Sequence, residues 1–166
     1  MIENRFFPEI HGNFGFGCMR LPMRDGHVDY DTFSAMADAF IAGWKTKYTV
    51  NLLRPITYVQ LVIDSNWVPS LMHTPPFPEY PSGHSVQSSS AAAILEKRFG
   101  ANTRFTDNTH NDRGWGPRTF ASFKAAADEA AVSRLYAGIH FRTGIEAGKV
   151  QGRCVASEVL KLKFEP

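Results

Sequence analysis

The chain has 166 residues, of which 43% are hydrophobic and 20% charged, and its formal net charge is +2. These values are typical of one globular domain with a single core, and the small charge argues against a nucleic-acid or acidic-membrane partner. No apolar run approaches the roughly 18 residues of a membrane-spanning helix, and the first residues lack the apolar segment of a signal peptide. We therefore expect a cytoplasmic protein in which Cys18 and Cys154 are free thiols rather than a bridge.

Two segments divide the chain. Residues 1–28 are rich in glycine, proline and phenylalanine and show no sustained period, which predicts an irregular N-terminal arm. Residues 29–166 alternate helical patterns with turn-rich stretches. We expect this second segment to form the folded domain.

The first helix is predicted to begin at Asp29 or Asp31, because acidic residues favour a first turn. It should end near Leu53 or Arg54, since Pro55 disfavours helical backbone in the residue before it. Residues at helical spacing form one apolar stripe: Phe33, Met36, Ala37, Phe40, Ile41 and Trp44.

The middle of the chain contains a short apolar segment, a loop and a helix. Residues 56–64 could be a strand or a helical turn, and periodicity does not decide between them. Residues 65–82 contain five prolines and predict a loop. Residues 83–99 read as a helix that ends at Gly100, a suitable C-cap.

Two more helices are predicted in the last third. Residues 101–118 read as a long turn-rich loop, in which the Asx residues favour turns over a metal site. A helix should follow from 119 to about 137, and a last one from about 145 to 162. In that last helix Gly148 and Gly152 would let another helix approach closely. Four long helical patterns with little strand predict an all-α helical bundle with long connecting loops.

The most distinctive local motif is Pro81-Ser82-Gly83-His84. It brings a hydroxyl, an imidazole and unpaired backbone N–H groups to the start of the third predicted element. A helix start with free N–H donors and the positive end of the helix dipole is suited to binding an anion.

Cationic residues elsewhere could meet such an anion. Lys47 and Arg54 are seven residues apart, which on one helix places them on the same face with Cα atoms roughly 10 Å apart. Two solvated cations on a surface helix would give the same spacing. Arg134 and His140 would point about 120° apart on an unbroken helix, whereas a break at Gly138 would free the imidazole to turn.

Taken together, these residues form three ordered blocks: Lys47-x6-Arg54-Pro55, Pro81-Ser82-Gly83-His84 and Ser133-Arg134-x5-His140. This pattern resembles the vanadium-dependent haloperoxidases and the type 2 phosphatidic acid phosphatase superfamily that shares their anion site. The segments 44–48, 74–80, 120–123 and 138–142 are similar to the soluble bacterial haloperoxidases. The resemblance extends over about residues 30–160.

The resemblance implies a role for each matching residue. Lys47, Arg54 and Arg134 would hold the equatorial oxygens of vanadate or phosphate, with hydrogen bonds from Ser82 and the Gly83 N–H. His140 would be the axial vanadium ligand, or the nucleophile of a phosphatase. The remaining implied roles are an acid–base function for His84 and a halide pocket lined by Trp44 and Phe77.

The implied reaction is the vanadate-dependent oxidation of a halide by hydrogen peroxide to hypohalous acid, which a small organic acceptor would then consume. Acid phosphatase activity at the same site is the alternative, because phosphate can occupy the vanadate position. A truncated relative that binds oxyanions without turnover is a third possibility. No nucleic-acid or membrane partner is expected.

Two departures from the family pattern lead to further expectations. The family usually places an aspartate four residues after the last histidine, but this chain has Gly144 there. We therefore expect a backbone carbonyl or Glu146 to support the His140 ring, and we favour the haloperoxidase over the phosphatase. Haloperoxidases of this type are also much longer before the lysine block. We expect a homodimer that buries the face of the 29–50 helix and the aromatic arm.

Overall fold

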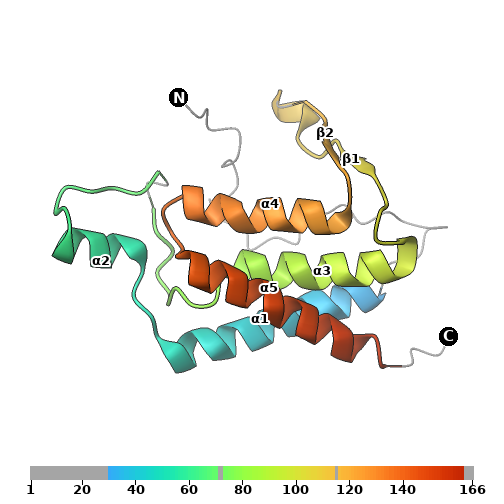
Figure 1. Cartoon of the computed structure of the whole chain (residues 1–166), viewed down its shortest axis with the longest axis horizontal. Coiled ribbons are helices and arrows are strands. Elements are labelled where there is room, and N and C mark those ends of the chain that lie inside the picture. Colours follow the sequence, from blue (N-terminus) through green and yellow to red (C-terminus); the bar gives the residue numbers. More distant parts are fainter. Residues whose placement is uncertain (1–29, 71–72, 115, 163–166) are drawn as a thin grey trace.

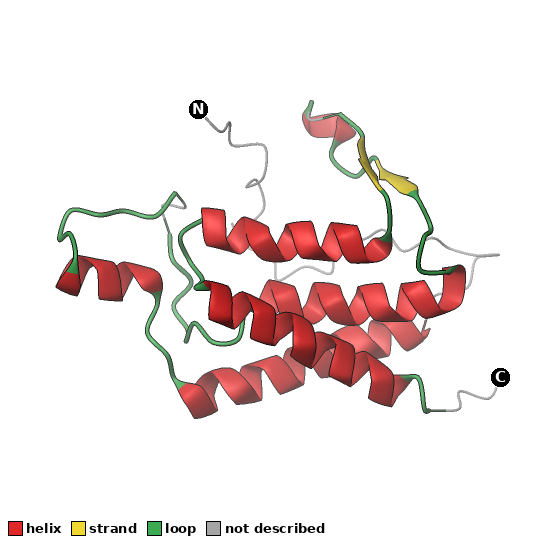
Figure 2. Cartoon of the chain, in the orientation of Figure 1, coloured by secondary structure: helices red, strands yellow, loops and turns green. Residues whose placement is uncertain are grey.

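The structure is a computed structural model that describes residues 30–70, 73–114 and 116–162. Within these ranges four long helices form a bundle, which confirms the all-α prediction (Figures 1 and 2): α1 (Tyr30–Val50), α3 (Gly83–Phe99), α4 (Phe123–Tyr136) and α5 (Arg142–Val159). The smaller elements are α2 (Pro55–Val62), strands β1 (Phe105–Asp107) and β2 (Arg118–Phe120), and the 3-10 turn η1 (Asn111–Arg113). None of the helices in the described ranges has the length and apolar character that crossing a bilayer requires. The predicted arm and Cys18 lie outside the described residues.

Helix α3 is the centre of the bundle, and α1, α4 and α5 all pack against it (Figure 1). Most of its buried positions are small, so three helices can approach it at once: Ser85, Val86, Ser89, Ser90, Ala91, Ala92, Ile94 and Leu95. Its bounds match the prediction of 83–99. Gly100 ends the helix with a φ of 103°, which favours glycine.

The predicted close approach at the glycines of α5 is confirmed. A Cβ atom added at Gly148 would lie 2.8 Å from the carbonyl oxygen of Ser82. One added at Gly152 would lie 3.0 Å from the backbone nitrogen of Ser90 and still closer to the carbonyl oxygen of Val86. Helix α5 therefore lies directly on the backbone of α3, including the first turn that begins at Ser82.

Helix α1 ends earlier than the sequence predicts. It stops at Val50, and Asn51 adopts a φ of 51°, a left-handed conformation that asparagine tolerates better than most residues. Arg54 is extended and precedes α2, which begins at Pro55. The prediction that Arg54 shares a helix with Lys47 is therefore wrong, and segment 56–64 is helical up to Val62 rather than a strand.

The buried face of α1 consists mostly of small residues: Thr32, Ala35, Ala39, Gly43 and Lys47. The apolar stripe predicted from the sequence lies partly at the surface, with Phe33 48% and Ile41 65% exposed. Small residues are buried because they let α1 approach α3 closely, as at Gly43, where an added Cβ would lie 3.7 Å from the Val86 side chain.

The long loop before α4 contains a hairpin. Strands β1 and β2 pair antiparallel, so α4 begins four residues later than predicted, after Ser122. The Ser122 hydroxyl caps this helix by accepting a hydrogen bond from the Ala125 N–H at 3.0 Å. An Asx turn, in which the Asp107 carboxylate accepts from the Thr109 N–H at 2.9 Å, also lies in this loop, as predicted. Helix α5 begins and ends three residues before the predicted positions.

Candidate active site

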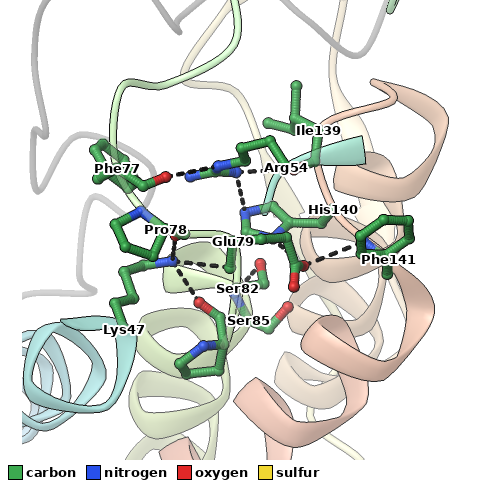
Figure 3. A network of polar contacts seen from close by, with 11 residues as sticks. Lys47, Arg54, Phe77, Pro78, Glu79, Ser82, Ser85, Ile139, His140 and Phe141 are labelled. Atoms are coloured by element: carbon green, nitrogen blue, oxygen red, sulfur yellow. Dashed lines mark hydrogen bonds and ion pairs between the residues drawn. The ribbon is translucent and has the colours of Figure 1, made fainter. Parts of the chain in front are cut away.

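Lys47 links the end of α1 to the proline-rich loop that leads into α3 (Figure 3). Its side chain is 0% exposed. The ammonium donates hydrogen bonds to the carbonyl oxygens of Pro78 at 3.0 Å, Glu79 at 3.0 Å and Pro81 at 2.5 Å. An ammonium group has three hydrogens, so all of them are directed at the loop. Burial, and then the nearby Arg54 guanidinium, lower the pKa of Lys47 from 10.5 to about 7.

Arg54 is the residue directly before α2, and its side chain extends into the same site. Its Nε donates to the carbonyl oxygen of Phe77 at 2.8 Å, and its Nη1 donates to that of Ile139 at 2.8 Å. The same Nη1 lies 3.1 Å from Nε2 of His140. The remaining nitrogen, Nη2, is buried without a hydrogen-bond partner in the described structure. Burial lowers the pKa of Arg54 to about 10, which leaves it charged at neutral pH.

His140 lies between Arg54 and a buried carboxylate (Figure 3). Its Nδ1 is 2.7 Å from Oε1 of Glu79, and the same oxygen accepts the N–H of Phe141 at 3.1 Å. Arginine is a donor only, so Nε2 of His140 must be the acceptor from Arg54. We therefore assign the proton to Nδ1. Desolvation, followed by Arg54, lowers the pKa of His140 well below its ordinary value, which favours this neutral form.

Arg134 and His84 form the opposite part of the site. Nε of the buried Arg134 side chain donates to the Ser133 hydroxyl at 3.0 Å, and Nη1 lies 3.4 Å from Nε2 of His84. Desolvation by the surrounding protein, and then the positive charge of Arg134, lower the pKa of His84. The His84 residue is nevertheless exposed, so water screens part of that effect.

Gly138 turns the chain between Arg134 and His140. Helix α4 ends at Tyr136, and Gly138, two residues before the histidine, has a φ of 73°. The expected break between Arg134 and His140 is therefore confirmed.

The start of α3 supplies the remaining polar groups. Ser82 is fully buried as the N-cap, and its hydroxyl accepts from the Ser85 N–H at 3.4 Å. Its own N–H donates to the Gly144 carbonyl at 2.9 Å. A Cβ added at Gly83 would lie 3.3 Å from the Trp44 ring, so the aromatic side chain packs closely on this first turn.

Two aromatic rings flank the cations. Trp44 and Phe77 have centroids 5.2 Å apart, and Nζ of Lys47 lies 5.7 Å and 5.3 Å from them respectively. The guanidinium carbon of Arg54 is 4.9 Å from the Phe77 centroid. The predicted halide-pocket residues therefore lie next to the cationic cluster, at distances typical of cation–π contacts.

Glu79 is the residue of the candidate site that sequence reasoning missed. We expected Glu146 or a backbone carbonyl to support His140, but the carboxylate of Glu146 pairs with Lys149 at 3.0 Å. The available signals were a single acidic residue within a proline-rich run and a glycine at position 144. Neither signal indicates by itself that the two positions meet.

The donor set fits an oxyanion rather than a bare metal cation. No group of three or more His, Cys, Asp or Glu side chains that could hold a metal ion is found in the part of the chain that the structure describes. Cationic and hydroxyl groups gather instead, and among the described residues Nη2 of Arg54 and Oγ of Ser85 are buried without hydrogen-bond partners, as is Oε2 of Glu79. Guanidinium donors and a helix start suit vanadate and phosphate equally well.

Comparisons with known proteins agree with this geometry. The family described as "VCPO second helical-bundle domain" matches residues 59–165. A solved bacterial vanadium-dependent iodoperoxidase is 51% identical, with a TM-score of 0.75 over 79% of this chain and 32% of that one. A bacterial vanadium-dependent chloroperoxidase in its holo form is 19% identical, with a TM-score of 0.66 over 79% of this chain and 34% of that one, and shows the fold alone. No curated protein matches.

The chain thus spans about a third of the length of these solved relatives. The family match covers more than half of the chain, and it includes the residues of the second and third motif blocks. The chain therefore belongs to the vanadium haloperoxidase superfamily, in the family of the VCPO second helical-bundle domain.

Proposed function

We propose that this chain binds vanadate and oxidises a halide with hydrogen peroxide to hypohalous acid. The observation that carries the proposal is the buried, neutral His140 ring, whose Nδ1 is held by Glu79 while its Nε2 accepts a hydrogen bond from Arg54. Ligation of vanadate by Nε2 would replace that hydrogen bond, and the Arg54 guanidinium would then be free to donate to an oxygen of the bound oxyanion.

Each residue of the candidate site has a separate role in this proposal. Arg54 would donate to the oxyanion from its Nη2 group, Arg134 would add a second guanidinium and Lys47 positive charge. The start of α3 would add the Ser82 hydroxyl and the Gly83 N–H. Bound vanadate would supply a Lewis-acid centre that activates hydrogen peroxide without a change in its own oxidation state. His84, on the exposed side, would transfer the proton.

Iodide is the halide that we propose to test first, because the solved relative with 51% identity is named an iodoperoxidase. Trp44 and Phe77 present a polarisable wall beside Lys47, which suits a large, weakly hydrated anion. The small organic acceptor would react with the hypohalous acid, so the site does not need a specific pocket for it.

The test measures the oxidation of iodide, and the bromination of a phenol-type dye, with and without added orthovanadate. We expect a vanadate-dependent signal that His140→Ala abolishes. His110→Ala is the matched control, since His110 lies in the hairpin loop and has no part in the proposed site. A wild type without a vanadate-dependent signal, or an unaffected His140→Ala, would refute the proposal.

Acid phosphatase activity is a second candidate, and Glu79 is the observation that favours it. A phosphohistidine mechanism needs an acceptor behind the nucleophilic ring, and the Glu79 carboxylate supplies one. Hydrolysis of p-nitrophenyl phosphate, inhibited by vanadate and lost in His140→Ala, would identify this activity. Vanadate binding in calorimetry without either turnover would identify an oxyanion-binding relative instead.

We also propose that residues 29–166 act as the catalytic unit in a homodimer. Large apolar side chains are exposed on α1 and α2, among them Ile41 at 65% and Leu61 at 77%. Patches of this kind commonly mark interaction surfaces. Light scattering coupled to size exclusion should give twice the chain mass at micromolar concentration, and a monomer would contradict this assembly.

A further inference from the structure

We propose, on the basis of the proposed function, that Glu79 is the positioning residue of His140 and that Gly144 is its required counterpart. In this chain the acceptor for the histidine comes from the loop before α3, and position 144 in the first turn of α5 is a glycine that leaves room for it. The identities of residues 79 and 144 are therefore coupled.

The contact between the Glu79 carboxylate and His140 is direct and buried. Glu79 is 0% exposed, and its Oε1 accepts from both Nδ1 of His140 and the N–H of Phe141. Two donors from consecutive residues on a single oxygen fix the carboxylate against the ring. Because Nδ1 keeps the proton, the lone pair of Nε2 is presented on the side of Arg54.

Gly144 is explained by the space that this carboxylate occupies. A Cβ added there would lie 2.8 Å from Oε2 and 2.9 Å from Cδ of Glu79, and closer still to Oε1. Even alanine would therefore displace the carboxylate. Glycine inside a helix costs about 1 kcal/mol relative to alanine. The collision that any larger residue would have with Glu79 explains why glycine nevertheless occupies position 144.

The backbone of Glu79 is held independently of its side chain. Its N–H donates to the Leu52 carbonyl at 2.9 Å, and its own carbonyl accepts from Nζ of Lys47 at 3.0 Å. The carboxylate therefore extends from a fixed point. Lys47 acts on His140 through this loop, since the same residue accepts from the lysine with its backbone and from the imidazole with its side chain (Figure 3).

The test is a double-mutant cycle on the full chain with two readouts that do not need turnover. Nitrogen-15 NMR of the histidine rings reports the His140 tautomer, and calorimetry reports vanadate affinity. We expect Glu79→Ala to lose the pure Nδ1–H tautomer and to weaken vanadate binding by about 10- to 100-fold. Gly144→Asp alone should weaken binding as well, because its side chain collides with Glu79.

The combined variant, Glu79→Ala with Gly144→Asp, decides the proposal. Removing the Glu79 carboxylate frees the space, and an aspartate at 144 can then accept from Nδ1. We expect the double variant to recover the tautomer and to bind vanadate within a few-fold of the wild type. Additive losses in the double variant, or an unchanged tautomer in Glu79→Ala, would overturn the coupling.

Two further variants keep the result interpretable. Glu146→Ala removes the surface acid of the first turns of α5 and should leave both readouts unchanged. If Glu79→Ala does not fold, Glu79→Gln carries the test: its amide oxygen still accepts from Nδ1, so the tautomer should persist while vanadate affinity falls about tenfold. Unchanged affinity in Glu79→Gln would count against the proposal. If the double-mutant cycle gives the expected result but the wild-type chain does not oxidise halide, only the proposed function is refuted.

Discussion

The contact between α5 and α3 can be tested at Gly152, with Gly43 as a matched control. Both glycines are inside helices and face Val86, but Gly43 meets its side chain and Gly152 meets its backbone. A Cβ at Gly43 would make ordinary contacts at 3.7 Å from both Val86 methyl groups. Gly43→Ala should therefore raise the free energy of unfolding by about 1 kcal/mol, the gain in helix propensity.

Gly152→Ala gains the same propensity but forces the helices apart. Its Cβ would lie at 3.0 Å from the Ser90 nitrogen and closer to the Val86 carbonyl oxygen, where backbone cannot move aside as a flexible side chain can. Overpacking of this kind costs typically about 1–3 kcal/mol or more. We therefore expect a net loss of roughly 1–2 kcal/mol, and a gap of at least about 2 kcal/mol between the two variants.

Urea denaturation followed by circular dichroism measures both free energies of unfolding. The two alanines are chemically identical and differ only in what they meet, so helix propensity cancels in the comparison. Equal stabilisation by both variants would show that α5 does not lie on the α3 backbone as described. The slope of the denaturation curve should stay constant, since neither change alters the surface that unfolding exposes.

Two other predictions concern the site. Because the pKa of Lys47 is about 7 in the folded chain and 10.5 when solvated, the unfolded state binds an extra proton between these values, and the free energy of unfolding should rise with pH across that window. Denaturation at pH 8 and 9.5, above the range in which solvated histidines titrate, should show this rise in the wild type and in Lys45→Met, but not in Lys47→Met. Gly138→Ala forces a φ of 73° on alanine and places its Cβ 2.9 Å from Pro69, so it should lower the melting temperature and displace His140, which the histidine NMR signals would report.

The helices could be predicted from the sequence where local signals coincide. Helix α3 begins after the Ser82 N-cap and ends at the Gly100 C-cap. Ser82 belongs to the Pro81–His84 motif, and Gly100 directly follows the last residue of the helical pattern. The helix predicted for α1 is too long because the apolar period of the sequence continues past Asn51. The left-handed backbone of Asn51 leaves no periodic signal in the sequence. The hairpin before α4 was missed because three-residue strands are too short to show an alternating pattern.

The site was predictable only as a set of residues. Their order along the chain indicated which groups would gather, and the structure places Lys47, Arg54, Arg134 and His140 on four different segments that meet at one end of the bundle. The partner of His140 was not predictable, because Glu79 lies 61 positions away in a loop. The family resemblance pointed to position 144, with Glu146 as the nearest acid, and a local sequence pattern cannot report a contact between two loops.

The charge balance of this cluster favours an oxyanion as the group that completes it. In the network of Figure 3, Lys47 and Arg54 are buried, and Glu79 supplies the one carboxylate among the residues drawn. Burial lowers the pKa of both cations, and the neighbouring Arg54 charge lowers that of Lys47 further, whereas Glu79 opposes the shift in each case. The carboxylate also faces the neutral His140 ring. A multiply charged oxyanion would offset the remaining positive charge of both cations, and its binding should in turn raise the pKa of Lys47.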